Sequence, residues 1–449
     1  MTDLQHEFRV EATVQRSAGL RQALDLVGRG IFRGAGPARC VPSAGAIFPY
    51  DVVVLVRRTD GEEAKLFRLD FARRAAVLLP VPGDLVEHLL ASPEPPSGAV
   101  TADLIVLTRP WLSMRKYGHR GYLYAQLDAG HVSTNLLGTA LDTGSATLRL
   151  RIPRRQIMDQ LWGLLPYREV HSVVSIGPAP QATGQPAWSS FRQYVTPGPD
   201  NRCDLERYCW SGIPRQLVEG SGAPGPVVDE PLIQPPVAGA GGAVPIRRGE
   251  WGALSQLRRS CKQFSELPPP GHAVAEAMGA LATPLPTDVT RPTDDARNGG
   301  LQITLAAVPG PLADACRAPA LRAGVNVVVS DRLTDREAVR YACMGQQHLS
   351  RAPAFVICHV KRHLLLAGAD GQTVRDAVYR AATAVQLLYL GATRSSVAVT
   401  AIGGQDVAAW RQLVDLPEDD ELLYLLALGL DQAGMGKHDR AELAHAHGE

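Results

Sequence analysis

A short basic segment, LRRSCKQF at residues 257–264, carries groups that can bind a phosphate monoester. Arg258, Arg259, Ser260 and Lys262 place three cations and a hydroxyl close together. Guanidinium groups form paired hydrogen bonds with phosphate oxygens, and a lysine adds a compact positive charge. Such a cluster is also typical of a solvated surface, so this segment alone leaves both interpretations open.

Two turns rich in small residues could let the backbone approach a flat ligand closely. The first is PSAGAIFP, residues 42–49, and the second is AIGGQD, residues 401–406. Glycine also exposes backbone N–H donors in such turns. An ordinary tight turn explains each segment equally well. The residues of interest are Pro42, Ser43, Ala44, Gly45, Gly403 and Gly404.

A lysine and a tyrosine are adjacent at Lys116 and Tyr117, just before an amphipathic helix predicted to begin near Gly121. If removed from water, such a pair can share a proton and act as one acid–base unit. His131, inside the predicted helix, fits a hydrogen-bonded core or interface histidine better than a chemical role. The pair Cys203 and Cys209 has no nearby histidine partners, so no metal site is predicted.

The middle of the chain differs in composition from its flanks. Residues 196–250 contain nine prolines and nine glycines, and this density disfavours both helix and central strand. We therefore predict a connector at residues 196–250 between two domains, residues 1–195 and residues 251–449. A chain of 449 residues is long enough to bury two ordinary cores.

The two predicted domains look like copies of each other. A turn leading into a strand, a second strand, an apolar helix and a closing strand occur in the same order in both. The pairs are VPSAGAIFPYDVVVLV and RPTDDARNGGLQITLAAV, ADLIVLT and AFVICHV, NLLGTA and QLLYLGAT, and HSVVSIG and LYLLALG, with offsets of 250 to 252 residues. Such a constant offset predicts an ancient tandem duplication. Strands that are apolar on both faces, mixed with helices, indicate α+β sandwich domains with covered sheets.

Charge and length argue against several classes of protein. The chain has 46 basic and 45 acidic residues, so it lacks a global field for nucleic acid or anionic lipid, and neither partner is expected. No apolar run reaches about 18 residues, and the first residues lack the layout of a signal peptide. Seven cysteines, an odd number, fit a reduced cytoplasmic protein rather than a disulfide framework.

Together these motifs resemble the nitroreductase-like flavoprotein superfamily, and within it the SagB-type (McbC-like) dehydrogenases. RRSCKQF is similar to the superfamily's RRSxRxF signature. PSAGAIFP and RKYGHRGYLYAQLDAGHVSTNLL are similar to the SagB-type pattern PSAGALYP…KYGxRgYrY…DaGHxxqNL. AIGG resembles the loop that meets the flavin N5 edge. The resemblance covers nearly the whole chain outside the connector.

Members of this superfamily are dimers that bind FMN at the subunit interface with residues of both protomers. The resemblance therefore implies two tandem nitroreductase-like domains that form an intramolecular pseudo-dimer around FMN. By this resemblance, the second domain would bind FMN through Arg258, Arg259 and Ser260 near the phosphate and ribityl chain, Lys262 near the N1/O2 edge, the N–H groups of Gly403 or Gly404 at N5, and Lys437 as a further phosphate cation. The first domain would close the pocket with Pro42, Ser43, Ala44 and Gly45.

A second FMN site would need the basic segment and glycine pair from the first domain and the PS turn from the second. These motifs are degraded, which predicts one working FMN site and one degenerate site. Where the first domain should carry the glycine pair it reads RLRIPRR, residues 149–155, without glycine. Its start, QRSAGLR, matches RRSxR poorly. In the second domain, Asp294 and Asp295 replace the small residues of the PS turn, and two carboxylates would repel a flavin phosphate.

Lys116 and Tyr117 match the Lys–Tyr pair that SagB-type azoline dehydrogenases are thought to use as their base. The resemblance implies oxidation of a thiazoline or oxazoline to the azole in a ribosomally made or carrier-bound peptide. A proton would pass to the Tyr/Lys unit while a hydride passes to flavin N5, with the two carbons held within reach of both. O2 would re-oxidise the flavin.

Two other functions remain open at this point. One is an NAD(P)H-dependent nitro or quinone reductase, which needs no Lys–Tyr base. The other is a flavin-free scaffold subunit of a biosynthetic complex, consistent with the loss of half the motifs. No additional leader-peptide recognition domain is evident before the first domain, so we expect that a cyclodehydratase or a leader-binding partner protein delivers the peptide.

Overall fold

The computed structural model describes residues 17–34, 38–57, 63–72, 74–90, 100–178, 190–193, 204–219, 225–233, 244–289, 300–366 and 371–432. Lys437, Cys203 and the segment from 292 to 295 lie outside these residues, so the predictions made for them are not addressed by the structure. None of the described helices is long and apolar enough to cross a membrane.

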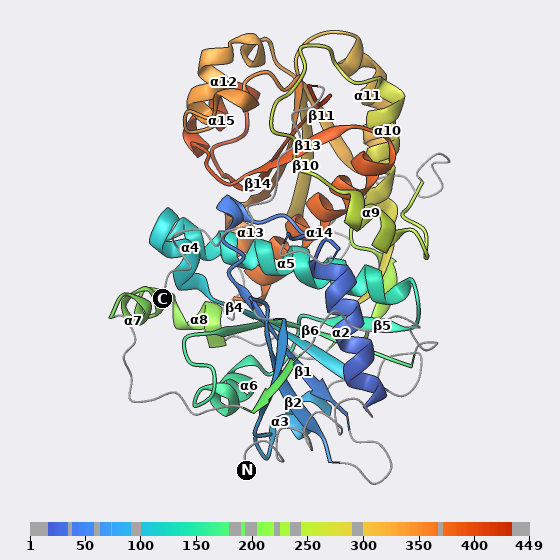
Figure 1. The fold of residues 1–449 in the computed structure, drawn as a ribbon. Coiled ribbons are helices and arrows are strands. Elements are labelled where there is room, and N and C mark those ends of the chain that lie inside the picture. The colour runs from blue at the N-terminus through green and yellow to red at the C-terminus, as the bar shows by residue number, and fades with distance from the viewer. Residues whose placement is uncertain are drawn as a thin grey trace.

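The described residues form two sheets, one above the other in Figure 1, with helices between and around them. The lower, nine-stranded sheet has the order β7-β3-β2-β1-β4-β6-β5-β9-β8. The upper, five-stranded sheet has the order β11-β10-β12-β14-β13. In the first sheet the strands are β1 (Tyr50–Val56), β2 (Lys65–Asp70), β3 (Ala75–Leu79), β4 (Ala102–Thr108), β5 (Ala146–Arg149), β6 (Glu169–Ile176), β7 (Ser190–Gln193), β8 (Val228–Pro231) and β9 (Pro284–Thr287). In the second they are β10 (Leu301–Ala307), β11 (Val325–Val329), β12 (Ala354–Lys361), β13 (Ala398–Ile402) and β14 (Asp420–Gly429).

The central strands of both sheets are buried along nearly their whole length, as β4 and β12 illustrate. Sheets covered on both faces need such runs of apolar side chains. The helices that supply this cover, in chain order, are α2 (Ala18–Ile31), α3 (Leu85–Leu90), α4 (Pro110–Tyr117), α5 (Arg120–Leu141), α6 (Arg154–Leu161), α7 (Asp204–Ser211), α8 (Arg215–Glu219), α9 (Trp251–Leu257), α10 (Gly271–Gly279), α11 (Pro311–Arg322), α12 (Arg336–Ala342), α13 (Arg362–Leu366), α14 (Gln372–Arg394) and α15 (Val407–Val414). The α+β class predicted from the sequence is thus confirmed, and the landmark strands and helices form where they were predicted.

The two sheets share an antiparallel core with the same order of matched strands. β1, β4, β6 and β5 follow one another in the first sheet as β10, β12, β14 and β13 do in the second. Each core also contains an irregularity at a matching place: the register shifts after Val106 of β4 and after Cys358 of β12. These two residues are 252 positions apart, within the range of offsets found in the sequence.

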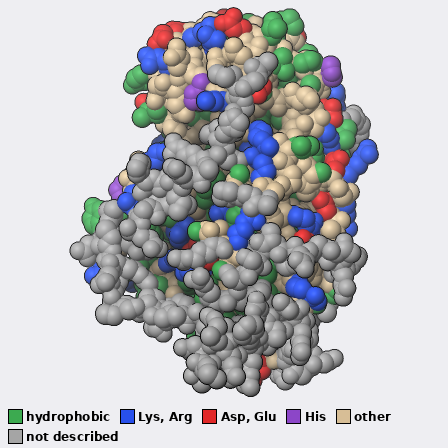
Figure 2. Space-filling view, viewed as in Figure 1, with side chains coloured by type: hydrophobic (Ala, Val, Ile, Leu, Met, Phe, Trp, Pro, Cys, Tyr) green, Lys and Arg blue, Asp and Glu red, His purple; other side chains and the backbone are tan. Residues whose placement is uncertain are grey.

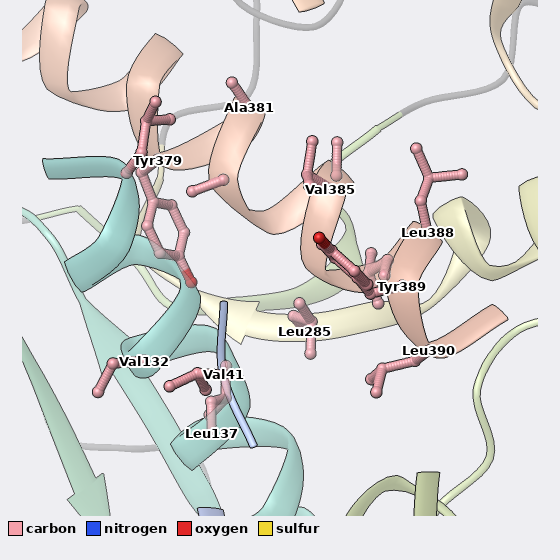
Figure 3. Close-up of a cluster of buried hydrophobic side chains, with 14 of the residues drawn as sticks. Val41, Val132, Leu137, Leu285, Tyr379, Ala381, Val385, Leu388, Tyr389 and Leu390 are labelled. Atoms are coloured by element: carbon pink, nitrogen blue, oxygen red, sulfur yellow. The ribbon is translucent and has the colours of Figure 1, made fainter. Parts of the chain in front are cut away.

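Helices α5 and α14 cross between the sheets and are buried over most of their length (Figure 1). Figure 3 shows Tyr379, Val385 and Tyr389 on α14 and Val132 and Leu137 on α5 within one buried cluster. This apolar packing joins the two parts of the chain into one core.

The contacts between these two helices repeat as they would across a two-fold axis. Gly130 lies against Ala382, and a Cβ on this glycine would come within 2.6 Å of the alanine Cβ. One pair of polar contacts lies on either side: His131 to Gln386 at 3.0 Å, and Thr134 to Thr383 at 2.9 Å. A shift of 252 positions converts each pair into the other, which is the reciprocity that an isologous interface requires.

The connector holds more structure than its composition suggests. Within residues 196–250 the structure has α7, α8 and the edge strand β8. Cys209, Ile213 and Val218 are buried against the first sheet's outer core, and this burial compensates for the neighbouring prolines and glycines. Pro231 is tolerated because β8 lies at the edge of its sheet.

The nine-stranded sheet also crosses the predicted domain boundary. β9 lies after residue 251, yet it pairs with β8 and, at Leu148 and Thr287, with β5 of the first part. Pairing with a neighbouring strand leaves fewer backbone groups unpaired than a free edge would. A division at residue 250 therefore separates two segments that share one sheet.

Candidate functional site

A cavity of about 500 Å³ opens where the two parts of the chain meet, a volume typical of a small-molecule site. Residues of both parts of the chain line it. The lining residues predicted from motifs are Pro42, Ser43, Ala44, Gly45, Lys116, Tyr117, Ser260, Lys262, Gly403 and Gly404. The lining residues to which the sequence analysis assigned no role include Tyr124, Asp128, Gln263, Gln346, His348, Tyr389, Thr400, Ala401 and Tyr424.

The PS turn is held in place by a buried carboxylate on α5. Ser43 Oγ donates to Asp128 Oδ2 at 2.5 Å, and the Ala44 N–H donates to Asp128 Oδ1 at 3.2 Å. Ser43 Oγ in turn accepts from the N–H of Phe48 at 2.8 Å. Burial raises the pKa of Asp128 to about 7, although the two hydrogen bonds favour its charged form. Asp128 therefore titrates near neutral pH at the cavity wall.

Gly45 brings this turn against the Lys–Tyr pair. Its φ is +62°, in the left-handed region that suits glycine, and an added Cβ would lie 2.5 Å from both Lys116 Nζ and Tyr117 Oη. Both functional groups thus meet at one backbone position of the turn. The close approach leaves no space for a side chain at residue 45.

The two residues of the pair differ in exposure, so the pair is not removed from water as one unit. Lys116 is exposed, while Tyr117 is half-buried with its ring edge-on to Tyr124 at 5.0 Å between centroids. Burial, followed by the nearby Asp128 carboxylate, raises the pKa of Tyr117 to about 12. Tyr117 is therefore a neutral phenol at physiological pH, a group that can donate a proton or a hydrogen bond.

The basic segment contributes to the cavity unevenly. Ser260 and Lys262 line it. Arg258 is buried behind them, where its guanidinium donates to Cys40 O at 2.5 Å and to Ser260 Oγ at 3.3 Å. Arg259 is exposed and donates to three backbone carbonyls at the end of α9. Arg258 thus braces the segment, and Arg259 caps a helix rather than lining the cavity.

The glycine pair follows β13 and closes the opposite wall. A Cβ on Gly403 would lie 3.2 Å from the Cβ of Ala44, so the two turns from distant parts of the chain nearly touch. A Cβ on Gly404 would lie 3.2 Å from Gln346 Nε2. The absence of side chains at Gly403 and Gly404 thus lets these neighbours pack closely at the cavity wall.

The hydroxyl groups of Tyr389 and Ser260 form a small network at this wall. Tyr389 Oη accepts from the Ala401 N–H at 2.7 Å and lies 3.1 Å from Ser260 Oγ. Because Arg258 already donates to Ser260 and Tyr389 has its own proton to donate, Ser260 can accept both and direct its own O–H into the cavity.

The donor set fits FMN better than a metal ion. Glycine-lined walls, backbone donors, the Ser260 hydroxyl and the Lys262 cation match a flat, oxygen-rich, anionic cofactor. Among the residues described by the structure, no group of three or more His, Cys, Asp or Glu side chains could hold a metal.

Among the described residues, the matching position on the other side of the α5–α14 crossing carries charged side chains. On α5 the cavity is lined by Tyr124 and Asp128; the residues 252 positions later, on α14, are Asp376 and Arg380. Asp376 accepts from Arg151 Nη2 at 3.0 Å, and Arg380 donates to Leu232 O in the connector at 2.5 Å. We call these groups and their neighbours the image cluster: Arg151, Arg154, Glu169, Asp288, Gln372, Arg375, Asp376 and Arg380.

Most of the image cluster is deeply buried. Arg375 forms an ion pair with Glu169, and Arg154 Nη1 donates to Gln372 Oε1 at 3.2 Å. Asp288 accepts from the N–H groups of Leu150 and Arg151. The segment RLRIPRR, which has Arg151 and Ile152 where the other part has Gly403 and Gly404, thus contributes to this cluster.

Comparison with known proteins supports the fold. No protein-family model matches the chain. A Methanocaldococcus jannaschii protein named as a putative nitroreductase is 28% identical over 113 residues, 24% of this chain and 57% of the relative's own length. The chain therefore matches little more than half of that relative.

The structure of a putative nitroreductase from Anabaena variabilis is similar over 92% of this chain and 88% of its own, with a TM-score of 0.61 and 18% identity. The NADPH:FMN oxidoreductase from Vibrio harveyi aligns with 42% of this chain and 71% of its own, at 16% identity and a TM-score of 0.27. The chain thus has a nitroreductase-like fold over almost its whole length.

Proposed function

We propose that this chain is an FMN-dependent oxidoreductase whose cofactor binds in the cavity between the two parts of the chain. The observation that carries the proposal is the convergence of the PS turn, the Lys–Tyr pair, Ser260, Lys262 and the glycine pair on one cavity. These segments are separated by up to about 360 residues in the sequence. The nitroreductase-like fold supports it independently.

We also propose that the two parts arose by duplication and form a pseudo-dimer with a single cofactor site. The repeated strand order, the matching register shifts and the reciprocal contacts between α5 and α14 support the duplication. The image cluster supports the single site, because its buried ion pairs and a hydrogen bond to a connector carbonyl involve the side chains that match the cavity wall. The predicted domain limits of 195 and 250 are part of this proposal.

Bound FMN would supply two-electron redox chemistry to a substrate lying on its ring. Ser260, the backbone of Gly403 and Gly404, and the turn from Pro42 to Gly45 would bind and orient it, with Lys262 as a cation of the second domain at the cavity wall. Arg258 would act through Ser260, which it holds by a hydrogen bond. Arg259 and Lys437 stay predictions as phosphate contacts.

For the substrate we propose a peptide-borne thiazoline or oxazoline, oxidised to the azole. Lys116 and Tyr117 support this choice, since such a reaction must remove a proton from a ring carbon. Tyr117 holds its own proton at neutral pH, so the Lys116–Tyr117 unit would first release one proton to solvent and then accept the substrate proton as a pair. A partner that delivers the peptide belongs to the same proposal.

A reductive function has equal support from one observation. Tyr117, with a pKa of about 12, is protonated at neutral pH and could donate a hydrogen bond or its proton to a reduced substrate, and reduction of a nitro group or quinone consumes protons. The similar M. jannaschii and A. variabilis proteins carry nitroreductase names. The same site could therefore run an NAD(P)H-dependent reduction.

One pair of assays separates these functions. The FMN-loaded chain is given a thiazoline-containing peptide under air, or NADPH with a nitroarene. Loss of two hydrogens from the peptide without NADPH oxidation supports the dehydrogenase. NADPH oxidation that depends on the nitroarene, with the peptide unchanged, supports the reductase. A colourless chain that takes up no FMN would leave the scaffold function. Processing of a leader-bearing peptide at full rate by the chain alone would remove the delivery partner from the proposal.

A further inference from the structure

A chain of buried hydrogen bonds runs from α9 to the cavity. The donor and the acceptor of each bond in it can be assigned. Its first members are Trp251 and Asn135. Trp251 Nε1 donates to Asn135 Oδ1 at 2.8 Å, and Asn135 Nδ2 donates to Gly30 O at 2.6 Å. An indole N–H can only donate and a peptide carbonyl can only accept. The two ends of the Asn135 amide are therefore fixed independently of each other.

The orientation of the Asn135 amide fixes the donors and acceptors of the next two members, Gln386 and His131. Asn135 Oδ1 also accepts from Gln386 Nε2 at 3.0 Å, so the Gln386 oxygen must face the other way. That oxygen lies 3.0 Å from His131 Nδ1, which must therefore carry a hydrogen. Burial, with the Arg258 charge adding to it, lowers the pKa of His131 to about 3. The ring is neutral, and its Nε2 is a bare acceptor.

The last member is Tyr424, a residue that lines the cavity. Its hydroxyl lies 2.9 Å from His131 Nε2. Because that nitrogen can only accept, the Tyr424 O–H must donate to it. The groups that act most on this hydroxyl are Asp128, Tyr389, Cys358 and Tyr124, and all of these except Cys358 line the cavity with Tyr424.

We propose that Tyr424 recognises an N–H or O–H group of the cavity's ligand and that His131 is the positioning residue that imposes this preference. With its only hydrogen committed to His131, Tyr424 Oη can offer the cavity nothing but lone pairs. A ligand carbonyl or phosphate oxygen placed there would meet repulsion between acceptors. Ser260 differs, because its hydroxyl can donate to the cavity when Tyr389 donates to it.

For the proposed cofactor this restricts which part meets Tyr424. Oxidised flavin has one ring donor, N3–H, and further donors on its ribityl hydroxyls, whereas N1, N5, O2, O4 and the phosphate only accept. The inference therefore assigns N3–H or a ribityl hydroxyl to Tyr424, and this assignment rests on the proposed FMN binding. The direction of the buried chain does not rest on it.

The first test reads the direction of the chain without any ligand. Side-chain ¹⁵N NMR of the full-length protein, with the His131 signal identified by its loss in His131→Gln, reports which ring nitrogen carries hydrogen. The expected result is a neutral ring protonated at Nδ1 down to about pH 4. A ring protonated at Nε2, or one that titrates near pH 6.5, would overturn the inference. In Gln386→Met, which removes the acceptor for Nδ1–H, the Nε2–H form is expected to appear.

The second test measures recognition. FMN binding, followed by flavin fluorescence, is expected to weaken by roughly 3- to 10-fold in Tyr424→Phe, the usual effect of losing one hydrogen bond. The exposed Tyr341 supplies the control, Tyr341→Phe, with no change expected. An unchanged dissociation constant in Tyr424→Phe would contradict the contact with ligand. If the wild-type chain binds no FMN at all, the proposed function fails, and the NMR result still decides the direction of the chain.

Discussion

The cavity and the image cluster occupy matching positions on the two sides of the α5–α14 crossing, and their described residues differ in size and charge. At the cavity, glycine, alanine and serine turns leave space, and the buried Asp128 holds the PS turn. At the image cluster, Arg151 and Ile152 stand at the positions that match Gly403 and Gly404, and Arg380 stands at the position that matches Asp128. The same pair of helices thus lies beside turns of small residues on one side and carries buried charged groups on the other.

Burial of charged side chains in the image cluster has an electrostatic cost in free energy. Burying so many charges is favourable only if each is paired, and the image cluster pairs Arg375 with Glu169 and Arg151 with Asp376. The cavity keeps few charges and leaves Lys116 and Lys262 exposed to solvent. One side is therefore organised for stability and the other for access.

The largest expected effect is on turnover at the cavity. Lys116→Ala should lower the rate with the correct substrate by 10²- to 10⁴-fold, the usual contribution of a positioned acid–base group. Lys116 is exposed, so the melting temperature should stay unchanged. The exposed neighbour Arg115 provides the control, Arg115→Ala. Equal rates for Lys116→Ala and wild type in both the oxidative and the reductive assay would remove Lys116 from the mechanism.

On the other side, Glu169→Gln should affect stability instead. Removing one member of a buried ion pair leaves Arg375 uncompensated, at a cost of about 3–5 kcal/mol of unfolding free energy. Glu337→Gln in the exposed pair with Arg340 should cost less than about 1 kcal/mol. Chemical denaturation of both variants measures the difference. FMN binding by Glu169→Gln should remain close to wild type below the unfolding transition; loss of cofactor from the folded variant would show that the two sides are not separate.

The pH dependence of stability should reveal Asp128. Its pKa is about 7 in the folded chain, against about 4 when unfolded. The folded state thus holds this proton more tightly, so the carboxyl's contribution is greatest below about pH 4 and is lost as pH rises to about 7. The loss is on the order of 4 kcal/mol at most.

Asp128→Asn removes this titration and leaves Asp288 and Asp376 in place. The difference in unfolding free energy between wild type and Asp128→Asn should therefore change between pH 4 and 7 in favour of the variant, and then level off. A difference that stays constant over this range would mean that Asp128 has an ordinary pKa.

A smaller effect should follow from filling the gap at the PS turn. Gly45→Ala places a methyl group against Lys116 Nζ and Tyr117 Oη, and we expect roughly a 10-fold loss of turnover from their displacement. Gly34→Ala is a matched control, since Gly34 also has a positive φ of +58° but has no atom within 4 Å of the added Cβ. If both variants lose the same activity, backbone strain rather than contact is the cause.

Much of this site could be predicted from the sequence because its residues lie in short motifs. The PS turn, the Lys–Tyr pair, Ser260, Lys262 and the glycine pair are all local patterns, and the structure brings them together. The long buried helices and strands could be predicted from their apolar patterns. These features depend on near neighbours in the chain.

The remaining features depend on contacts between distant residues. Asp128 stands among apolar residues of a helix, a pattern that could have signalled a buried functional carboxylate, but its partner Ser43 is 85 positions away. Tyr389 and Tyr424 look like ordinary core aromatics until His131 and Ser260 are placed beside them. Arg259 matches a phosphate-binding motif, yet helix capping takes its hydrogen bonds. The pairing of β9 with the first sheet likewise has no local signal.

The proposal of one cofactor site rather than two is tested most directly by measuring how much FMN each chain binds. Purified chain is saturated with FMN, freed of excess, and denatured, and the released FMN is measured per chain. The account predicts one FMN per chain, with no second site in equilibrium titration. Two FMN per chain would contradict the proposal of a single site. No bound FMN, even after reconstitution, would contradict the proposed function itself.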